Sequence, residues 1–306
     1  MTMHIAILGP GALGCLFGCL LRTELSAEQA RIVLVDHKRD RASRRQQSGL
    51  SFVRRGAEKA QRVQIDCSAD PAGLGSMDLI LVCTKAHQTS AAMAQALPLV
   101  GPKTSVWSLQ NGLGNMEALA RHVPAQQILG GVTSQGAYWR KQDLLVHAGI
   151  GDTWLGVMEK GDQDAQAIMD LFNAAGVALQ HADDIRLPIW KKLLISAGIN
   201  PLTALARVTN GQVAENPSLR RAARLLLNEA VAVAAAQGIE LDAEQAFTSL
   251  LKVAKDTADN RSSMRCDVEA GRKTEIDAIN GAVASLGHAP ANALVTELIR
   301  SMGRDA

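Results

Sequence analysis

The chain has few aromatic side chains and almost no net charge. Four Trp, four Phe and one Tyr among 306 residues leave little surface for stacking nucleic-acid bases. The 32 basic and 30 acidic residues nearly cancel, and the basic ones are scattered apart from one short run at residues 37–41. This composition does not indicate a polyanion-binding surface, so we expect no nucleic-acid partner.

Long apolar runs are absent as well. The longest candidate for a membrane span covers residues 225–236 and is interrupted by Asn228 and Glu229, whereas a span needs about 18 or more apolar residues. The N-terminal residues lack a basic region followed by an apolar run, which predicts no signal peptide. We therefore expect a cytoplasmic protein with no membrane partner.

The five cysteines show no pairing pattern. They stand at positions 15, 19, 67, 83 and 266, without the paired spacing of a disulfide framework or a zinc site. Cys15 and Cys19 are one helical turn apart, but no second Cys or His pair lies nearby in the sequence. We interpret them as packed thiols and predict no metal site.

Short apolar runs alternate with helical segments in the first part of the chain. With 47% apolar residues, the chain is long enough for two domains with substantial cores. Continuous apolar runs separated by helices are typical of parallel strands buried on both faces. We predict an α/β fold with a Rossmann-type, doubly wound parallel sheet in residues 1–183, its strands lying near 4–8, 32–35, 79–83 and 105–109.

The second part of the chain is helical in pattern. We predict an all-helical domain over residues 184–306, in which Pro201 and Gly238 each end a helix. Asp242 and Gln245 fit a capping box at the start of another helix. The expected helices cover residues 184–199, 218–237, 242–259 and 274–286.

A glycine motif links the first predicted strand to a helix. Gly9-x-Gly11-x-x-Gly14 permits a tight turn, close approach of the backbone to a pyrophosphate, and close packing of helix on strand. Such turns also occur for purely structural reasons, but the strand-turn-helix context and Asp36 at the end of the next strand indicate dinucleotide binding. Asp36 suits a ribose 2′-hydroxyl, whereas His37, Lys38 and Arg39 suit a 2′-phosphate, so the dinucleotide stays open.

One carboxylate near the C-terminus has no evident partner in the sequence. Thr274 and Asp277 fit a capping box at the start of the last predicted helix, which leaves Glu275 unassigned. Glu275 either complements the positive end of the helix dipole or pairs with a distant group.

Several blocks together resemble the ketopantoate reductase family over nearly the whole chain. The glycine loop is shared with many dehydrogenases, whereas the blocks of the second domain are more specific. The blocks are residues 9–14, Thr84-Lys85-Ala86-His87-Gln88, Gln110-Asn111-Gly112-Leu113-Gly114, Trp190-Lys191-Lys192-Leu193, residues 199–204, Ser262-Ser263-Met264, Asp267 and residues 271–281.

The resemblance implies reduction of the 2-oxo group of 2-dehydropantoate to (R)-pantoate, with NADP(H) preferred and NAD(H) kept open by Asp36. It implies that Lys192 is the proton donor and that Glu275 binds the substrate hydroxyl. The substrate-binding residues would be Asn111, Ser196, Asn200, Asn210 and Ser263. The cofactor-binding residues would be Gly9, Pro10, Gly11, Ala12, Leu13, Gly14, Asp36, Lys38, Arg39, Lys85, Gln88 and Asn111.

Lys192 suits this chemistry. Hydride addition to a ketone leaves negative charge on the oxygen, which an ammonium group stabilises and protonates. Lys192 shares a helix stripe with Ser196 and Asn200, at spacings of four. Without the resemblance, a solvated surface lysine would be the simpler interpretation.

Other functions stay open. The family usually has an asparagine where this chain has Ser196, so a related reductase of another 2-oxo or 3-hydroxy acid is an alternative. A non-catalytic, NADPH-binding regulator is a third hypothesis, which Lys192 and Glu275 disfavour. The expected partner is a small-molecule 2-oxo acid, and the sequence leaves a homodimer open.

Overall fold

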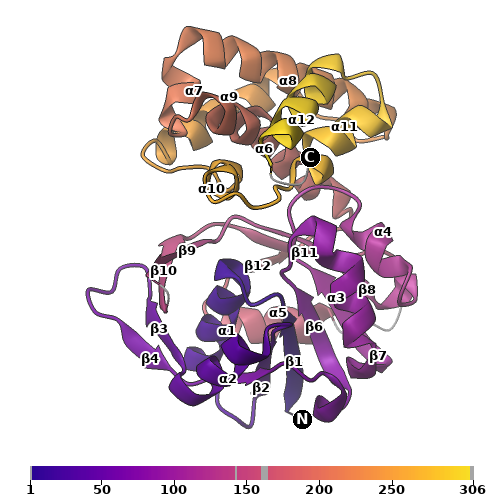
Figure 1. Ribbon diagram of the computed structural model, residues 1–306. Helices are drawn as coiled ribbons and strands as arrows, with labels where there is room; N and C mark the ends of the chain where they lie inside the picture. The colour runs from indigo at the N-terminus through magenta and orange to yellow at the C-terminus, as the bar shows by residue number, and fades with distance from the viewer. Residues whose placement is uncertain (1, 142, 160–164, 304–306) are drawn as a thin grey trace. The chain divides into compact units, whose positions relative to one another are not determined.

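The computed structural model describes residues 2–141, 143–159 and 165–303, and the chain divides into two compact units. The first comprises the residues up to Gln110 together with Asn115–Ile185, and the second comprises Asn111–Gly114 together with the residues from Arg186 onward. The predicted α/β class is confirmed (Figure 1). No helix in the described parts of the chain is both long and apolar enough to cross a membrane.

The first unit contains an eight-stranded sheet of order β12-β11-β8-β7-β6-β1-β2-β5. Six neighbouring strands, from β8 to β5 in this order, are all parallel, and β11 is antiparallel to β8. The predicted parallel sheet is therefore present. The strands are β1 Met3–Leu8, β2 Ala30–Val35, β5 Asp66–Ser68, β6 Met77–Val82, β7 Val100–Ser108, β8 Ile128–Thr133, β11 Thr153–Val157 and β12 Leu179–His181.

Both faces of this sheet are buried. In β1, Ile5 and Ile7 belong to one apolar core, while Ala6 and Leu8 belong to another, as the alternation of side chains along a strand requires. The first core includes an aromatic cluster in which the ring of Phe172 lies 5.1 Å from that of Trp107. The covering helices are α1 Ala12–Glu24, α2 Arg39–Ser48, α3 Thr89–Ala96, α4 Asn115–Ala120 and α5 Ala165–Ala174.

A second, four-stranded sheet was not predicted. Its order is β4-β3-β10-β9, and it packs against α1 (Figure 1). Its sequence signal is weak, because β3 and β4 have only four and three residues and β9 has no buried residue. The strands are β3 Leu50–Val53, β4 Gln61–Val63, β9 Gly136–Lys141 and β10 Leu144–Gly149.

The described part of the second unit is built from helices around one apolar core. The longest helices, α6 and α8, pack against each other, and α11 packs against α12 (Figure 1). The helices are α6 Arg186–Ala206, α7 Gly211–Glu215, α8 Pro217–Ala236, α9 Ala243–Asp256, α10 Ser263–Glu269, α11 Asn280–Leu286 and α12 Pro290–Met302.

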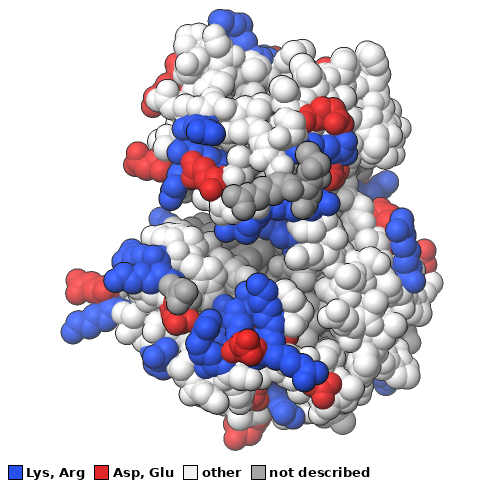
Figure 2. Space-filling view, viewed as in Figure 1, with Lys and Arg blue, Asp and Glu red and all other residues white. Residues whose placement is uncertain are grey.

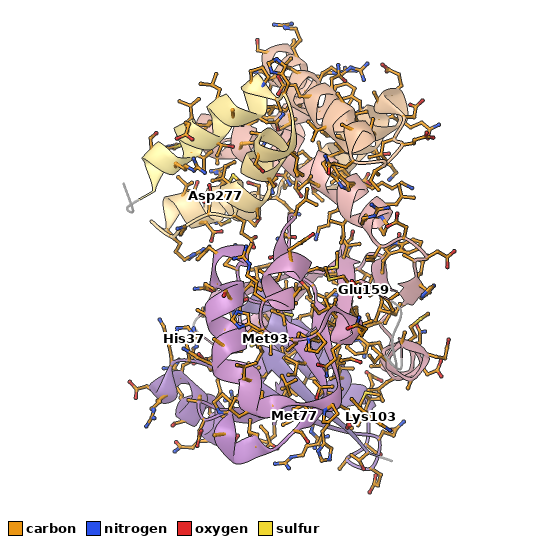
Figure 3. All side chains as sticks on the ribbon, turned by 90° about the vertical axis from the view of Figure 1, so that its right-hand side faces the viewer. His37, Met77, Met93, Lys103, Glu159 and Asp277 are labelled. Atoms are coloured by element: carbon orange, nitrogen blue, oxygen red, sulfur yellow. The ribbon has the colours of Figure 1, made fainter. Side chains whose placement is uncertain are left out.

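Two predicted helix boundaries are wrong. Pro201 does not end α6, because the Ala197 carbonyl, which loses its usual helix partner at a proline, accepts a hydrogen bond from Asn280 Nδ2 instead. The capping box of Thr274 and Asp277 is also absent. Asp277, which is labelled in Figure 3, pairs with Arg300 of α12, and a 3-10 turn, η5 Ile276–Ala278, precedes α11.

Candidate active site

Three predicted site residues form a hydrogen-bonded chain in the second unit. Lys192 Nζ, on α6, donates to Asn111 Oδ1 at 2.8 Å. Asn111 Nδ2 in turn donates to Glu275 Oε2 at 3.0 Å. We refer to Lys192, Asn111 and Glu275 as the triad. Asn111 therefore presents its acceptor to the ammonium group and its donor to the carboxylate, an arrangement that the sequence did not predict.

The backbone around Asn111 is fixed by the segment that follows Glu275. Leu113 N donates to the Ala278 carbonyl at 2.8 Å. Gly112 has a φ of +84°, and a Cβ atom at this position would lie 2.3 Å from the Ala278 oxygen. Only glycine combines this backbone conformation with so close an approach. The Asn-Gly turn thus holds Asn111 against the 3-10 turn η5.

The environment of Lys192 adjusts its protonation. Its partial removal from water lowers the pKa of the ammonium group to about 8, although the nearby Glu275 carboxylate acts in the opposite direction. Glu275 itself is only 6% exposed. A lysine with a pKa near 8 is largely protonated at neutral pH and yields its proton more readily than an ordinary lysine does.

The other predicted substrate residues lie on neighbouring elements of the second unit. Ser196 and Asn200 are half-buried and follow Lys192 by one and two turns on α6. Asn210 precedes α7, and its Nδ2 donates to Thr257 Oγ1 at 3.0 Å. Ser263 is exposed and is the first residue of α10, after Ser262, whose side chain caps that helix. The first two share the helix that carries Lys192, whereas Asn210 directs its amide to Thr257.

The glycine loop has the geometry expected of a phosphate-binding turn. Gly9 has a φ of +79°, and a Cβ atom there would lie 2.6 Å from Thr84 Cγ2. A Cβ atom on Gly14 would likewise lie 2.6 Å from the Gly9 carbonyl oxygen. A Cβ atom on Gly11, in contrast, would have no neighbour within 4 Å. Gly11 stands at the N-terminus of α1, so the open side of the turn faces the positive end of a helix.

The remaining residues of the cofactor prediction surround this loop or follow a strand. Pro10 is buried, and Ala12 and Leu13 begin α1. Lys85 directly precedes the 3-10 turn η2 Ala86–Gln88, which follows β6, and Gln88 is the last residue of that turn. In the described residues, no group of three or more His, Cys, Asp or Glu could hold a metal ion.

The Asp36 carboxylate already accepts hydrogen bonds from other groups of the protein. It is 1% exposed, and Arg41 of α2 donates to both of its carboxylate oxygens, through Nε and, at 2.7 Å, through Nη2. The Lys38 backbone N–H donates at 3.0 Å. Burial alone would raise the pKa of Asp36, but the bonds from Arg41 and Lys38 outweigh it and keep that pKa below its usual value.

A second arginine joins Asp36 to the glycine loop. Arg45 Nη1 donates to the Pro10 carbonyl at 2.8 Å and lies 3.7 Å from Asp36 Oδ2. The sequence interpretation missed Arg41 and Arg45. The feature of the sequence that could have indicated these two arginines is the basic character of α2, which begins three residues after Asp36. Basic side chains gather over this helix in Figure 2. Lys38 and Arg39, which were predicted, are exposed at its start.

Comparisons with known families cover both units. Residues 5–160 match the family model described as ketopantoate reductase PanE/ApbA, and residues 184–303 match the model of its C-terminal domain. The 2-dehydropantoate 2-reductase of Halobacterium salinarum is 33% identical over 99% of this chain and 100% of its own length. That of Archaeoglobus fulgidus is 36% identical over 94% of this chain and 91% of its own length.

A solved structure of a complex with NADH is also similar. The ternary complex of D-mandelate dehydrogenase with NADH and anilino(oxo)acetate has a TM-score of 0.90 and 25% identity, and the match covers 98% of both chains. The similarity therefore extends over nearly the full length of both chains.

Proposed function

The chain belongs to the ketopantoate reductase family, and we propose on this basis that it reduces the 2-oxo group of 2-dehydropantoate to (R)-pantoate, on the route to pantothenate and coenzyme A. The observation that carries the proposal is the triad, which joins a lysine of lowered pKa to a buried carboxylate through one amide. We assign cofactor binding to residues 1–183 and substrate binding with catalysis to residues 184–306, with Asn111 serving both.

Each member of the triad has a distinct part in the proposed reaction. The nicotinamide cofactor supplies the hydride that the ketone carbon accepts. Lys192 Nζ donates a hydrogen bond to the carbonyl oxygen and gives it a proton as negative charge develops. Asn111 keeps Lys192 oriented, and Glu275 accepts the hydrogen bond of the distal substrate hydroxyl. The other substrate-binding residues of the proposal are Ser196, Asn200, Asn210 and Ser263.

We further propose a preference for NADPH. A free aspartate at the end of β2 would repel a ribose 2′-phosphate, but the Asp36 carboxylate is engaged by Arg41 and approached by Arg45. Lys38 and Arg39 are exposed beside it. The charge available to a phosphate at this edge is therefore positive. The glycine loop, Lys85 and Gln88 would bind the remainder of the dinucleotide.

Initial rates with 2-dehydropantoate, measured with NADPH and NADH in parallel, test substrate and cofactor together. We expect rapid oxidation of NADPH with formation of (R)-pantoate, and a lower kcat/KM with NADH. Absence of turnover with either nucleotide would refute the proposed substrate. Equal or greater efficiency with NADH would refute only the proposed cofactor preference.

A second candidate is reduction of another 2-oxo acid. Ser196 favours it, because a hydroxyl stands where the family usually has a longer amide. The similarity in fold to D-mandelate dehydrogenase adds to it. A panel of branched, aromatic and hydroxylated 2-oxo acids distinguishes the candidates, since the highest kcat/KM identifies the substrate framework that the site accommodates.

We also propose that the protein is a cytoplasmic homodimer. All five cysteines are free thiols, which suits a reducing compartment. Leu294 and Leu298 lie one turn apart on α12 and are 60% and 43% exposed, so they offer an apolar stripe that a second subunit could cover. Sedimentation equilibrium tests the assembly: Leu294→Glu should dissociate a dimer, whereas a wild-type monomer would refute it.

A further inference from the structure

The helix that carries Lys192 contains a proline in its interior. α6 continues past Pro201 to Ala206. Proline has no N–H, so it cannot donate the helix hydrogen bond to the carbonyl four residues earlier. That carbonyl belongs to Ala197, which is fully buried. A buried carbonyl without a partner would weaken the fold, so another donor is needed.

Asn280 supplies that donor from a distant part of the sequence. Its Nδ2 lies 3.1 Å from the Ala197 oxygen, and the residue has no exposed surface. The same nitrogen donates to Asn292 Oδ1 at 2.9 Å. Asn292 is likewise fully buried, and its own amide donates to the Leu226 carbonyl at 3.0 Å and to Glu229 Oε2 at 2.9 Å. Asn280 is therefore hydrogen-bonded to Asn292 of α12, and Asn292 is hydrogen-bonded to residues of α8.

This contact joins the two segments that carry the charged members of the triad. Ala197 follows Lys192 by five residues on α6, and Asn280 follows Glu275 by five residues through the turn η5. Asn111 connects the segments at one point, and the bond from Asn280 to Ala197 connects them at a second. Two separate connections restrict the separation of the segments more than either connection alone.

We infer that Asn280 is a positioning residue, which holds Lys192 at its working distance from Glu275 by bonding the carbonyl that Pro201 leaves available. This inference rests on the proposed function, in which Lys192 is the proton donor. Asn280 touches neither substrate nor cofactor in this account. Its effect on turnover passes through the placement of α6 relative to the segment of Glu275.

The proline itself provides a way to separate positioning from stability. Asn280→Ala removes the donor and leaves the Ala197 carbonyl unpaired. Adding Pro201→Ala gives α6 its own N–H, which can pair with that carbonyl inside the helix. The double variant therefore repairs the helix but has no side chain linking Ala197 to the segment of Glu275.

We expect Asn280→Ala to lower Tm by roughly 5–10 °C. It should also lower kcat by about 10- to 100-fold, because small misplacements of a catalytic group are costly. The double variant should regain most of the lost Tm but little of the kcat. The exposed Asn228 provides a matched control, and Asn228→Ala should change neither quantity.

A titration that needs no substrate completes the test. NMR of protein labelled with 15N at lysine side chains, assigned with Lys192→Met, reports the Lys192 pKa directly. That pKa should fall below about 8 in both Asn280 variants, because Glu275 moves away.

A double variant that regains both Tm and kcat, or that keeps the wild-type Lys192 pKa, overturns the positioning role. A double variant no more stable than Asn280→Ala overturns the assignment of the Ala197 bond. Failure of wild-type turnover with 2-dehydropantoate would instead count against the proposed function alone.

Discussion

Glu275→Gln should move the alkaline limit of activity to lower pH. The pKa of Lys192 is about 8, the net result of two opposing influences: removal from water lowers it, and the Glu275 carboxylate raises it. The protonated lysine is the proton donor, so turnover is lost as the pH rises through this pKa. Replacing the carboxylate with a neutral amide removes the stabilising charge and leaves the desolvation, so the limit should fall.

The size of the movement follows from the geometry of the triad. The ammonium and carboxylate groups are separated by two hydrogen bonds of 2.8 and 3.0 Å and the amide between them. Two unit charges roughly 7 Å apart, close to the longest separation that this path allows, interact by about 0.6 kcal/mol in water and by about 2.4 kcal/mol at an effective dielectric constant of about 20. These energies correspond to a fall of about 0.5 to 2 in the Lys192 pKa.

The assay is the pH dependence of kcat/KM, which reports ionisations of the free enzyme. Wild type should lose activity above pH about 8, and Glu275→Gln should lose it at a pH lower by about 0.5 to 2. Glu244→Gln is the control, because Glu244 is an exposed partner of Arg224 and should leave the limit unchanged. A limit that stays in place or moves to higher pH in Glu275→Gln would refute this electrostatic reasoning.

Three further substitutions test other parts of the site. Lys192→Arg keeps the charge but does not deprotonate in the accessible range, so whatever activity remains should show no alkaline loss near pH 8 in the same profile. Arg41→Ala removes the hydrogen bonds that engage the buried Asp36 carboxylate, which would then repel a 2′-phosphate. In initial-rate measurements, the KM for NADPH should rise about 10- to 100-fold and the KM for NADH much less. Equal changes in the two KM values would contradict the proposed role of Arg41. Gly112→Ala forces a side chain against the Ala278 carbonyl at a positive φ, so thermal denaturation should show a lower Tm, and unchanged stability would contradict the geometry.

The parts of the fold that the sequence could predict depend on local patterns. The continuous apolar runs correspond to β1, β2, β6 and β7, and the glycine spacing corresponds to the turn between β1 and α1. The small sheet could not be predicted, because β3 and β4 have only four and three residues, β9 has no buried residue and the apolar run of β10 is only three residues long. The end of α6 was misplaced because the donor that compensates for Pro201 lies 83 residues from Ala197.

The same reasoning explains what could be predicted of the site. Lys192 and Asn111 are 81 positions apart, and Asn111 and Glu275 are 164 positions apart. No periodicity connects positions so distant, so only the resemblance to a known family linked them before the structure did. Whether Asp36 is free to bind a ribose or is engaged by the protein depends on the direction of its side chain, which the sequence does not specify. In the structure that side chain turns toward Arg41.

Hydride transfer to 2-dehydropantoate by Lys192→Met, followed in a single turnover as loss of NADPH absorbance, tests the central claim most directly. Methionine preserves most of the side-chain volume but removes the ammonium group. We predict a rate lower by about 100- to 10,000-fold, with an unchanged Kd for NADPH. A rate close to that of wild type in a correctly folded protein would contradict the assignment of Lys192 as the proton donor.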